Sequence, residues 1–183
     1  QTIRKWLSLK LRRQVVPPVH LVDRYLKAAA PLGIVNDNKP IDYFVKNNYD
    51  IATLLPATHH NGYIGFIIGA AHFTKRMPNE KIISICRQLN RPIVLLGGND
   101  VKGNGSMIAA AVGPNVYNAC GVTSLDESVF LVSKAESIIG FDTGLTHIAE
   151  AFNKPIASIW GSTVPELLGV QPYKVDNVLI SGV

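Results

Sequence analysis

From residue 63 onward, apolar runs alternate with segments of helical periodicity, and this alternation constrains the fold class most. The apolar runs are bounded by Gly, Pro or Asn and predict strands at 63–70, 92–98, 115–121, 137–141, 155–161 and 177–182. Helices are expected between them at 78–89, 105–113, 124–135 and 145–152. Strands that alternate with helices of this length are typical of βαβ units, so we expect an α/β fold with a Rossmann-like, doubly wound parallel sheet.

Residues 1–60 lack this regularity. After Pro17-Pro18, apolar residues at helical spacing predict a helix over 21–29, which Pro31 and Gly33 end, and residues 41–45 indicate a short strand. The polar stretch THHNG at 58–62 is a boundary signal. A chain of 183 residues is long enough for one buried core. We therefore expect a fragment at 1–60 and a Rossmann-like domain at 61–183.

The composition is that of an ordinary globular chain, with 47% hydrophobic and 17% charged residues. Pro, Gly, Asn or His interrupt the longest uncharged stretches, so no membrane span is expected. A chain that starts at Gln1 with no signal peptide indicates a sequence that begins inside a longer gene. Cys86 and Cys120 lie in apolar contexts without metal-ligand spacing, which favours a reducing compartment and disfavours zinc.

The excess positive charge lies in the N-terminal part of the chain. Residues 1–50 carry nine Lys or Arg against four Asp or Glu, and residues 4–13 are the densest segment, RKWLSLKLRR. Two interpretations of this segment stay open: a solvated helix face, or a peripheral contact with anionic lipid on the inner membrane face. Nucleic acid is disfavoured, because no aromatic-basic ladder or known binding module follows.

The loops that follow the predicted strands are rich in glycine and hydroxyl groups. Ligands of open α/β sheets bind at the carboxyl ends of the strands. Those ends here carry the sequences GAAHFTKRMP, GGNDVKGNG, GVTS, DTG and GSTVPE. Such loops let backbone N–H groups approach phosphate closely. The pattern therefore predicts a site for a nucleotide with a diphosphate.

Asp142 is expected to end a strand, with Thr143, Gly144 and Leu145 offering N–H groups at the start of the next helix. The positive end of the helix dipole makes this an anion site. Plain helix capping by Asp142 and Thr143 is the alternative. His147 lies about one helical turn beyond Thr143 and is expected to be a structural hydrogen-bond partner rather than a catalyst.

Rival site classes fit less well. A DTG that follows an apolar run also occurs in aspartic proteases, but those loops join β-strands, whereas a helix follows here. The chain has no G-x-G-x-x-G after a strand, no G-x-x-x-x-G-K-[ST] and no G-x-S-x-G. Dinucleotide-dependent redox enzymes, P-loop NTPases and α/β-hydrolases are therefore disfavoured.

The segment FDTGLTHIAEAFNKPIASIWGSTVPE at 141–166 resembles glycosyltransferase family nine, the ADP-heptose:lipopolysaccharide heptosyltransferases. Members carry a DTGLSHLAAAL-like segment, then KP, a strand and a G-x-T-x-P loop. Residues 69–81 are similar to the family's G-x-x-x-x-x-K-x-W-P loop, with Met77 in place of Trp, and residues 95–101 are similar to a strand-end loop with an acidic residue. Residues 19–33 resemble the helix before the interdomain linker, so the likeness covers nearly the whole chain.

This resemblance implies the donor-binding half of a GT-B fold at 61–183 and the end of the acceptor-side domain at 1–60. It implies that Lys75 contacts the donor diphosphate and that Asp142 binds sugar hydroxyls, both acting catalytically by stabilising the donor side. The other substrate-binding residues it implies are Asp100 at the ribose, Val122 and Thr123 at the base, Thr143, Gly144 and Leu145 at phosphate, His147 in support, and Gly161 and Thr163 in the last loop. No metal or cofactor is expected, because a lysine and a helix N-terminus supply the positive charge.

The resemblance further implies a bacterial, cytoplasmic, inverting enzyme that transfers heptose, with ADP-heptose as donor and a lipid-linked anionic glycan such as the lipopolysaccharide core as acceptor. The general base belongs to the acceptor-side domain, so we expect this chain to bind nucleotide without turnover. A non-catalytic nucleotide-sugar-binding module is the main alternative, and another GT-B enzyme such as an epimerase is a third. Ser162 and Val164 depart from the family's GPTDP-type loop.

Overall fold

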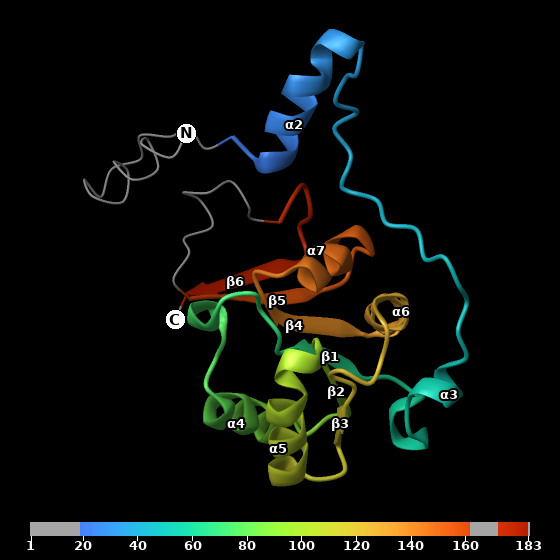
Figure 1. Ribbon diagram of the computed structural model, residues 1–183, viewed down its shortest axis with the longest axis vertical. Helices are drawn as coiled ribbons and strands as arrows, with labels where there is room; N and C mark the ends of the chain where they lie inside the picture. Colours follow the sequence, from blue (N-terminus) through green and yellow to red (C-terminus); the bar gives the residue numbers. More distant parts are fainter. Residues whose placement is uncertain (1–18, 162–171, 183) are drawn as a thin grey trace, which may run out of the picture.

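The computed structural model describes residues 19–161 and 172–182, and its centre is a six-stranded sheet (Figure 1). The strand order is β3-β2-β1-β4-β5-β6, and every neighbouring pair is parallel. The strands are β1 Ile64–Ile67, β2 Ile93–Leu96, β3 Val116–Asn118, β4 Ser137–Phe141, β5 Ile156–Trp160 and β6 Val178–Gly182. Successive strands are added outward from β1 on one side and from β4 on the other, as in a doubly wound sheet. The predicted α/β fold is therefore confirmed.

Helices fill the connections between the strands. The α-helices are α2 Leu21–Ala29, α3 Ile51–Leu54, α4 Asn79–Leu89, α5 Lys102–Val112, α6 Leu125–Lys134 and α7 Gly144–Ala151. Short 3₁₀ turns lie at η1 Ala30–Leu32, η2 Ala57–His59, η3 Phe73–Lys75 and η4 Asn99–Val101. Helix α5 begins three residues before the predicted start at 105. The 3₁₀ turn η4 leads directly into it, although the sequence KGNG contains weak helix formers.

Two apolar layers cover the two faces of the sheet. On one face, Ile82 and Cys86 of α4 and Ile108 of α5 pack on alternate residues of β1 and β2. On the other face, Leu131 of α6 and Ala149 of α7 pack on the remaining residues of the same sheet. Figure 1 shows α4 and α5 on the opposite side of the sheet from α6 and α7. The continuous apolar runs of the central strands follow from this two-sided burial.

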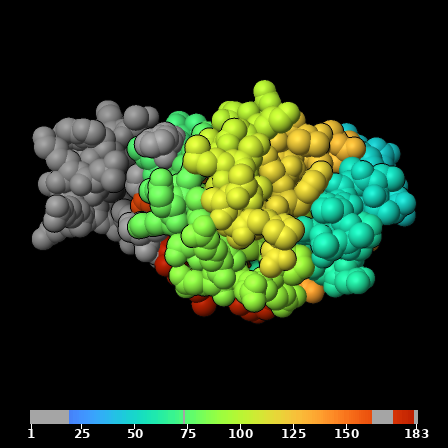
Figure 2. Space-filling view, turned by 90° about the horizontal axis from the view of Figure 1, so that it is seen from below, coloured from blue at the N-terminus to red at the C-terminus, as the bar shows by residue number. Residues whose placement is uncertain are grey.

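Residues 49–59 pack on the same core as the sheet. The Tyr49 ring lies 5.6 Å from the Phe130 ring, and Ile51 and Leu54 contact the α6–α7 layer. His59 is fully buried, with Nε2 at 3.2 Å from the carbonyl oxygens of Ile93 and Asn115. Figure 2 shows the cyan and blue-green segment of this region against the yellow surface near residue 120. The predicted boundary near residue 60 stays a prediction.

The strand expected at 41–45 is wrong. This segment is extended, and the structure assigns no strand to it. Ile41, Tyr43 and Val45 are half-buried while the residues between them are exposed, and the Tyr43 ring lies 6.0 Å from Phe152 in an edge-on contact. The period-two pattern therefore marks an extended segment whose Tyr43 contacts the residue after α7, and its backbone pairs with no described strand.

Helix α2 occupies the position that the sequence predicts and contacts the C-terminal part of the chain. Gly33, at φ 80°, ends the helical segment with its N–H on the Ala30 carbonyl oxygen. Tyr173 donates a hydrogen bond of 2.6 Å to Asp23, and Asn36 contacts both side chains at 2.9 and 3.0 Å. This cluster joins α2 to the residues just before β6.

No helix in the described ranges has the length and apolar character that crossing a bilayer requires. The basic segment at 4–13, for which a membrane contact was predicted, lies outside the described residues.

Candidate nucleotide-binding site

All six strands run parallel, so the loops that follow them meet at one edge of the sheet. The loops after β1 and β2 approach so closely that a Cβ on Gly97 would lie 2.5 Å from Val101 Cγ2 and 3.3 Å from the Gly69 nitrogen. A hollow of about 260 Å³ opens beside them. Its lining includes Gly69, Gly97, Gly98, Asp100, Thr143, Gly144 and Leu145. The glycine-rich turns predicted from the sequence therefore share one edge.

The start of α7 is held tightly against the end of β4. Thr146 Oγ1 donates a 2.7 Å hydrogen bond to the Phe141 carbonyl oxygen, and a Cβ on Gly140 would lie 2.7 Å from the same hydroxyl oxygen. Position 140 therefore requires glycine, because the Thr146 hydroxyl leaves no room for a Cβ there. Among the described residues, the backbone N–H groups of 143, 144 and 145 have no hydrogen-bond acceptor, and no side chain caps the helix. Capping of the helix by the side chains of Asp142 and Thr143 is thus excluded, and three N–H groups at the positive helix end have no acceptor among the described residues.

Asp142 lies between two cationic side chains. Lys75 Nζ pairs with Oδ2, and His147 Nε2 lies 3.5 Å from Oδ1. His147 Nδ1 lies in turn 2.9 Å from Oε1 of Glu150, which is only 2% exposed. Charges of alternating sign thus follow one another from Lys75 on η3 to Glu150 within α7.

These contacts shift the protonation of both inner groups. The hydrogen bond from His147, followed by the contacts with Lys75, holds the pKa of Asp142 below its ordinary value. Hydrogen bonds to Asp142 and then to Glu150 raise the pKa of His147 to about 9. At neutral pH, His147 is therefore an imidazolium cation and Asp142 a carboxylate.

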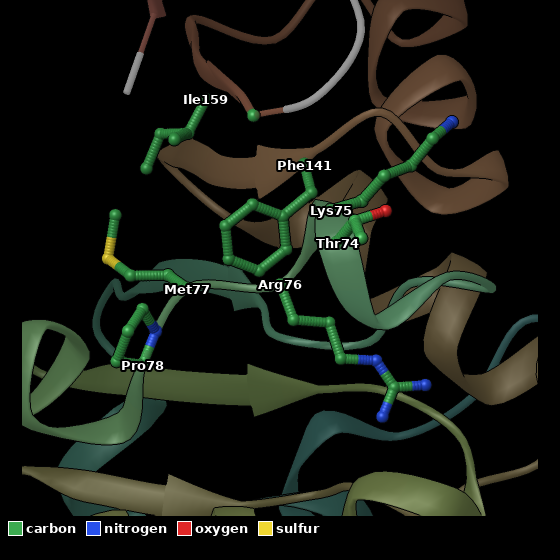
Figure 3. A pocket seen from close by; sticks show the side chains of 8 residues that line it. Thr74, Lys75, Arg76, Met77, Pro78, Phe141 and Ile159 are labelled. Atoms are coloured by element: carbon green, nitrogen blue, oxygen red, sulfur yellow. The ribbon is translucent and has the colours of Figure 1, made fainter.

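A second cavity, of about 370 Å³, lies between η3 and the carboxyl ends of β4 and β5. Figure 3 shows Met77, Pro78 and Ile159 around the Phe141 ring, with the long side chains of Lys75 and Arg76 drawn to the other side. The cavity has an apolar wall and a cationic edge. Its apolar wall suits a ring, while the two cations at its edge are paired with carboxylates, Lys75 with Asp142 and Arg76 with Asp100.

Arg76 ties the loops after β1 and β2 together. Its guanidinium donates hydrogen bonds of 2.9 and 2.6 Å to the Ala70 carbonyl oxygen and pairs with Asp100 Oδ2 at 2.5 Å. Asp100, predicted to reach a ribose, is 58% exposed at its side chain and so remains accessible at the edge of the hollow.

The predicted site residues fall into four groups. Those brought together at the β4–α7 junction and its hollow are Lys75, Asp100, Asp142, Thr143, Gly144, Leu145 and His147. Gly161 lines the cavity beside Lys75, and a Cβ there would lie 2.9 Å from the Thr74 carbonyl oxygen. Val122 is 58% exposed after β3, while the Thr123 hydroxyl is engaged by Ala119 and Ser128. Thr163 lies outside the described residues.

Sequence reasoning missed Arg76, Glu150 and Phe141. Glu150 follows His147 by three residues, a spacing that places two side chains on one helix face, so this pair could have been found. Arg76 follows Lys75 directly, but its contact with Asp100 joins two loops, and local sequence carries no signal for it. Phe141 appears as one more apolar residue of a strand.

Within residues 19–161 and 172–182, no group of three or more His, Cys, Asp or Glu side chains is arranged to hold a metal ion.

A parallel, doubly wound sheet with glycine-rich turns and an uncapped helix start at one edge defines a Rossmann-like domain of the kind found in GT-B proteins. The sequence profile of glycosyltransferase family 9 (heptosyltransferase) matches residues 1–182. The chain therefore belongs to glycosyltransferase family 9.

Curated relatives are similar over part of their length. Lipopolysaccharide heptosyltransferase 2 of Escherichia coli K12 is 32% identical over 128 residues, which cover 65% of this chain and 37% of that protein. The protein of the same name from Salmonella typhimurium is 30% identical over the same length. The matched region thus spans little more than a third of these relatives.

Solved heptosyltransferase structures share the fold. The structure titled E. coli ADP-heptose lps heptosyltransferase II superposes with a TM-score of 0.63 at 27% identity, covering 72% of this chain and 40% of that one. E. coli heptosyltransferase WaaC with ADP gives a TM-score of 0.67 at 24% identity, covering 91% of this chain and 51% of that one. These neighbours are GT-B proteins, and the second was solved with ADP.

Proposed function

We propose that this chain is the donor-binding part of an inverting heptosyltransferase and binds the diphosphate of a nucleotide sugar at the start of α7. The observation that carries the proposal is the set of three backbone N–H groups, at 143 to 145, that have no acceptor among the described residues and lie beside Lys75 and Asp142. Family membership and the ADP-bound relative support an ADP-sugar, with ADP-heptose as the donor.

The geometry supports a specific division of tasks. Glycosyl transfer leaves a nucleoside diphosphate, and stabilising its developing charge is the main electrostatic task. The amides at the positive end of α7 and the Lys75 ammonium are suited to hold the two phosphates. Asp142 is suited to accept hydrogen bonds from sugar hydroxyls, and the apolar wall of Phe141 and Ile159 to exclude water.

The acceptor is proposed to be a lipid-linked anionic glycan of the lipopolysaccharide core, because the curated relatives are lipopolysaccharide heptosyltransferases. Membrane contact through residues 4–13 remains part of this proposal. Inverting transfer needs a base at the acceptor hydroxyl, and the resemblance assigns that base to the acceptor-side domain. We therefore expect the 183-residue chain to bind donor nucleotide and to transfer no sugar.

Calorimetry of the chain with ADP, UDP and GDP tests the site. We expect ADP to bind, and the Lys75→Ala variant to bind it at least about tenfold more weakly, or about 1.4 kcal/mol. Lys81→Ala is the matched control, because it removes the same charge from an exposed position of α4. Equal binding of all three nucleotides, or none, would contradict the proposal, as would equal effects of the two substitutions.

A further inference from the structure

Glu150 is a buried carboxylate for which the nucleotide site described above has no use. It lies within α7, is 2% exposed and contacts His147 Nδ1 through Oε1 at 2.9 Å. An ionised carboxylate is costly to bury unless a charged or hydrogen-bonding partner compensates it.

The partner of Glu150 is also a partner of Asp142. The imidazole of His147 uses one nitrogen for Glu150 and the other, at 3.5 Å, for Asp142 Oδ1. Lys75 occupies the second oxygen of Asp142. Each oxygen of Asp142 thus has its own cation, one from η3 and one from α7.

This arrangement bears on how Lys75 becomes available to a ligand. In the structure its ammonium is engaged by Asp142, so contact with a diphosphate requires it to leave a partly buried carboxylate. Breaking a buried pair by removing one partner is strongly unfavourable, because the other charge remains uncompensated. A protonated His147 removes that penalty, since Asp142 keeps one cation after Lys75 has moved.

We propose that Glu150 is a positioning residue that keeps His147 protonated, so that Asp142 stays paired when Lys75 turns to the diphosphate of a bound nucleotide. This role rests on the proposed function. Among the described residues, the ionisable groups that face His147 are Asp142 from the end of β4 and Glu150 from α7, with Lys75 of η3 one contact further through Asp142. Without Glu150, His147 keeps only its contact with Asp142, so its pKa is lower and it compensates the Asp142 charge less fully once Lys75 has moved.

Titration of the His147 ring by nuclear magnetic resonance, without nucleotide, tests the first half of the proposal. The signal is assigned with His147→Gln. In the unsubstituted chain we expect a midpoint near 9, and in Glu150→Gln a midpoint at clearly lower pH. An ordinary histidine midpoint near 6.5 in the unsubstituted chain, or a midpoint that Glu150→Gln leaves unchanged, would overturn the proposal without any need for a binding assay.

Calorimetry with ADP at pH 7.5 tests the second half. We expect Glu150→Gln to weaken binding by about tenfold, the effect of losing one charge-assisted contact. Adding Asp142→Asn to Glu150→Gln is expected to restore most of the affinity, because Lys75 is then no longer held. Glu80→Gln, at an exposed position of α4, is the control and is expected to bind ADP as the unsubstituted chain does.

The outcomes separate this proposal from the proposed function. If the unsubstituted chain binds no nucleotide, the proposed function fails, and the ring titration still decides whether Glu150 keeps His147 charged. If ADP binds and Glu150→Gln has no more effect than Glu80→Gln, or if the double variant is as weak as the single one, the role of Glu150 is refuted while the site stands.

Discussion

At the scale of single residues, His147 links the chemistry of the site to the stability of the fold. The pKa of His147 is raised to about 9 in the folded chain, above the ordinary value of 6.5. Between these two values the folded chain binds a proton that the unfolded chain releases. The stabilisation is fully present below pH 6.5 and is lost as pH rises through about 9.

We therefore expect the free energy of unfolding to fall from pH 7 to pH 9.5 more steeply in the unsubstituted chain than in His147→Gln. Urea unfolding at several pH values measures both slopes. His147→Gln serves as the reference because other groups also make the free energy of unfolding fall as pH rises. Burial raises the pKa of Cys86 to about 11 and that of Cys120 to about 12, and both thiols contribute a similar slope in the two proteins. Parallel curves for the two proteins would contradict the assigned charge on His147.

How far the site could be predicted depends on the kind of signal each residue carries. Thr143, Gly144 and Leu145 were predictable, because a strand, a turn and a helix in sequence fix where their N–H groups face. The pairing of Lys75 with Asp142 joins residues far apart in the chain, so it follows only from the structure. Arg76 was missed for the same reason, since its partner Asp100 lies on another loop.

At the scale of elements, α5 carries two glycines with opposite structural demands. A Cβ on Gly103 would meet nothing within 4 Å, whereas a Cβ on Gly105 would lie 2.2 Å from Asn118 Oδ1. Asn118 accepts a hydrogen bond from the Cys120 N–H and donates to Ser106, so it fixes the end of β3 against α5. The two positions form a matched pair within one helix.

Gly103→Ala is expected to stabilise the chain by about 0.5–1 kcal/mol, because alanine loses less backbone entropy than glycine in a helix. Gly105→Ala is expected to destabilise it by about 1–3 kcal/mol through overpacking against Asn118. Chemical denaturation of both variants measures the difference. A stabilising Gly105→Ala would show that α5 can shift away from β3 without cost.

Most elements were predictable because their pattern is local. The apolar runs at 63–70 and 92–98 became β1 and β2, and the spacing of Ser124 and Glu127 became a capping box at α6. The pattern at 41–45 misled because a strand requires a neighbour, and periodicity cannot show whether one exists. Helix α3 was not predicted, since four residues are too few to display a period.

At the scale of the whole molecule, the contact between α2 and Tyr173 joins the two ends of the described chain. The Tyr173 hydroxyl contacts both Asp23 and Asn36, and its ring lies 4.6 Å from His20. We expect Tyr173→Phe to cost about 1 kcal/mol at this contact and to accelerate amide hydrogen exchange in α2 about fivefold. Exchange in the sheet should not change.

Tyr25→Phe is the control, because Tyr25 lies on the same helix and is 67% exposed. Equal exchange in the two variants would indicate that α2 is held by its apolar contacts and not by the Tyr173 hydroxyl.

The order of the strands also bears on synthesis at the ribosome. β1 lies in the middle of the sheet between β2 and β4, and its partner Ser137 follows Ile64 only after two intervening βα units. While a nascent chain ends before β4, β1 is an open edge that carries Phe66 and Ile67. The first three strands thus emerge as a half-sheet with an unpaired apolar edge, which is open to pairing with another chain until β4 has been synthesised.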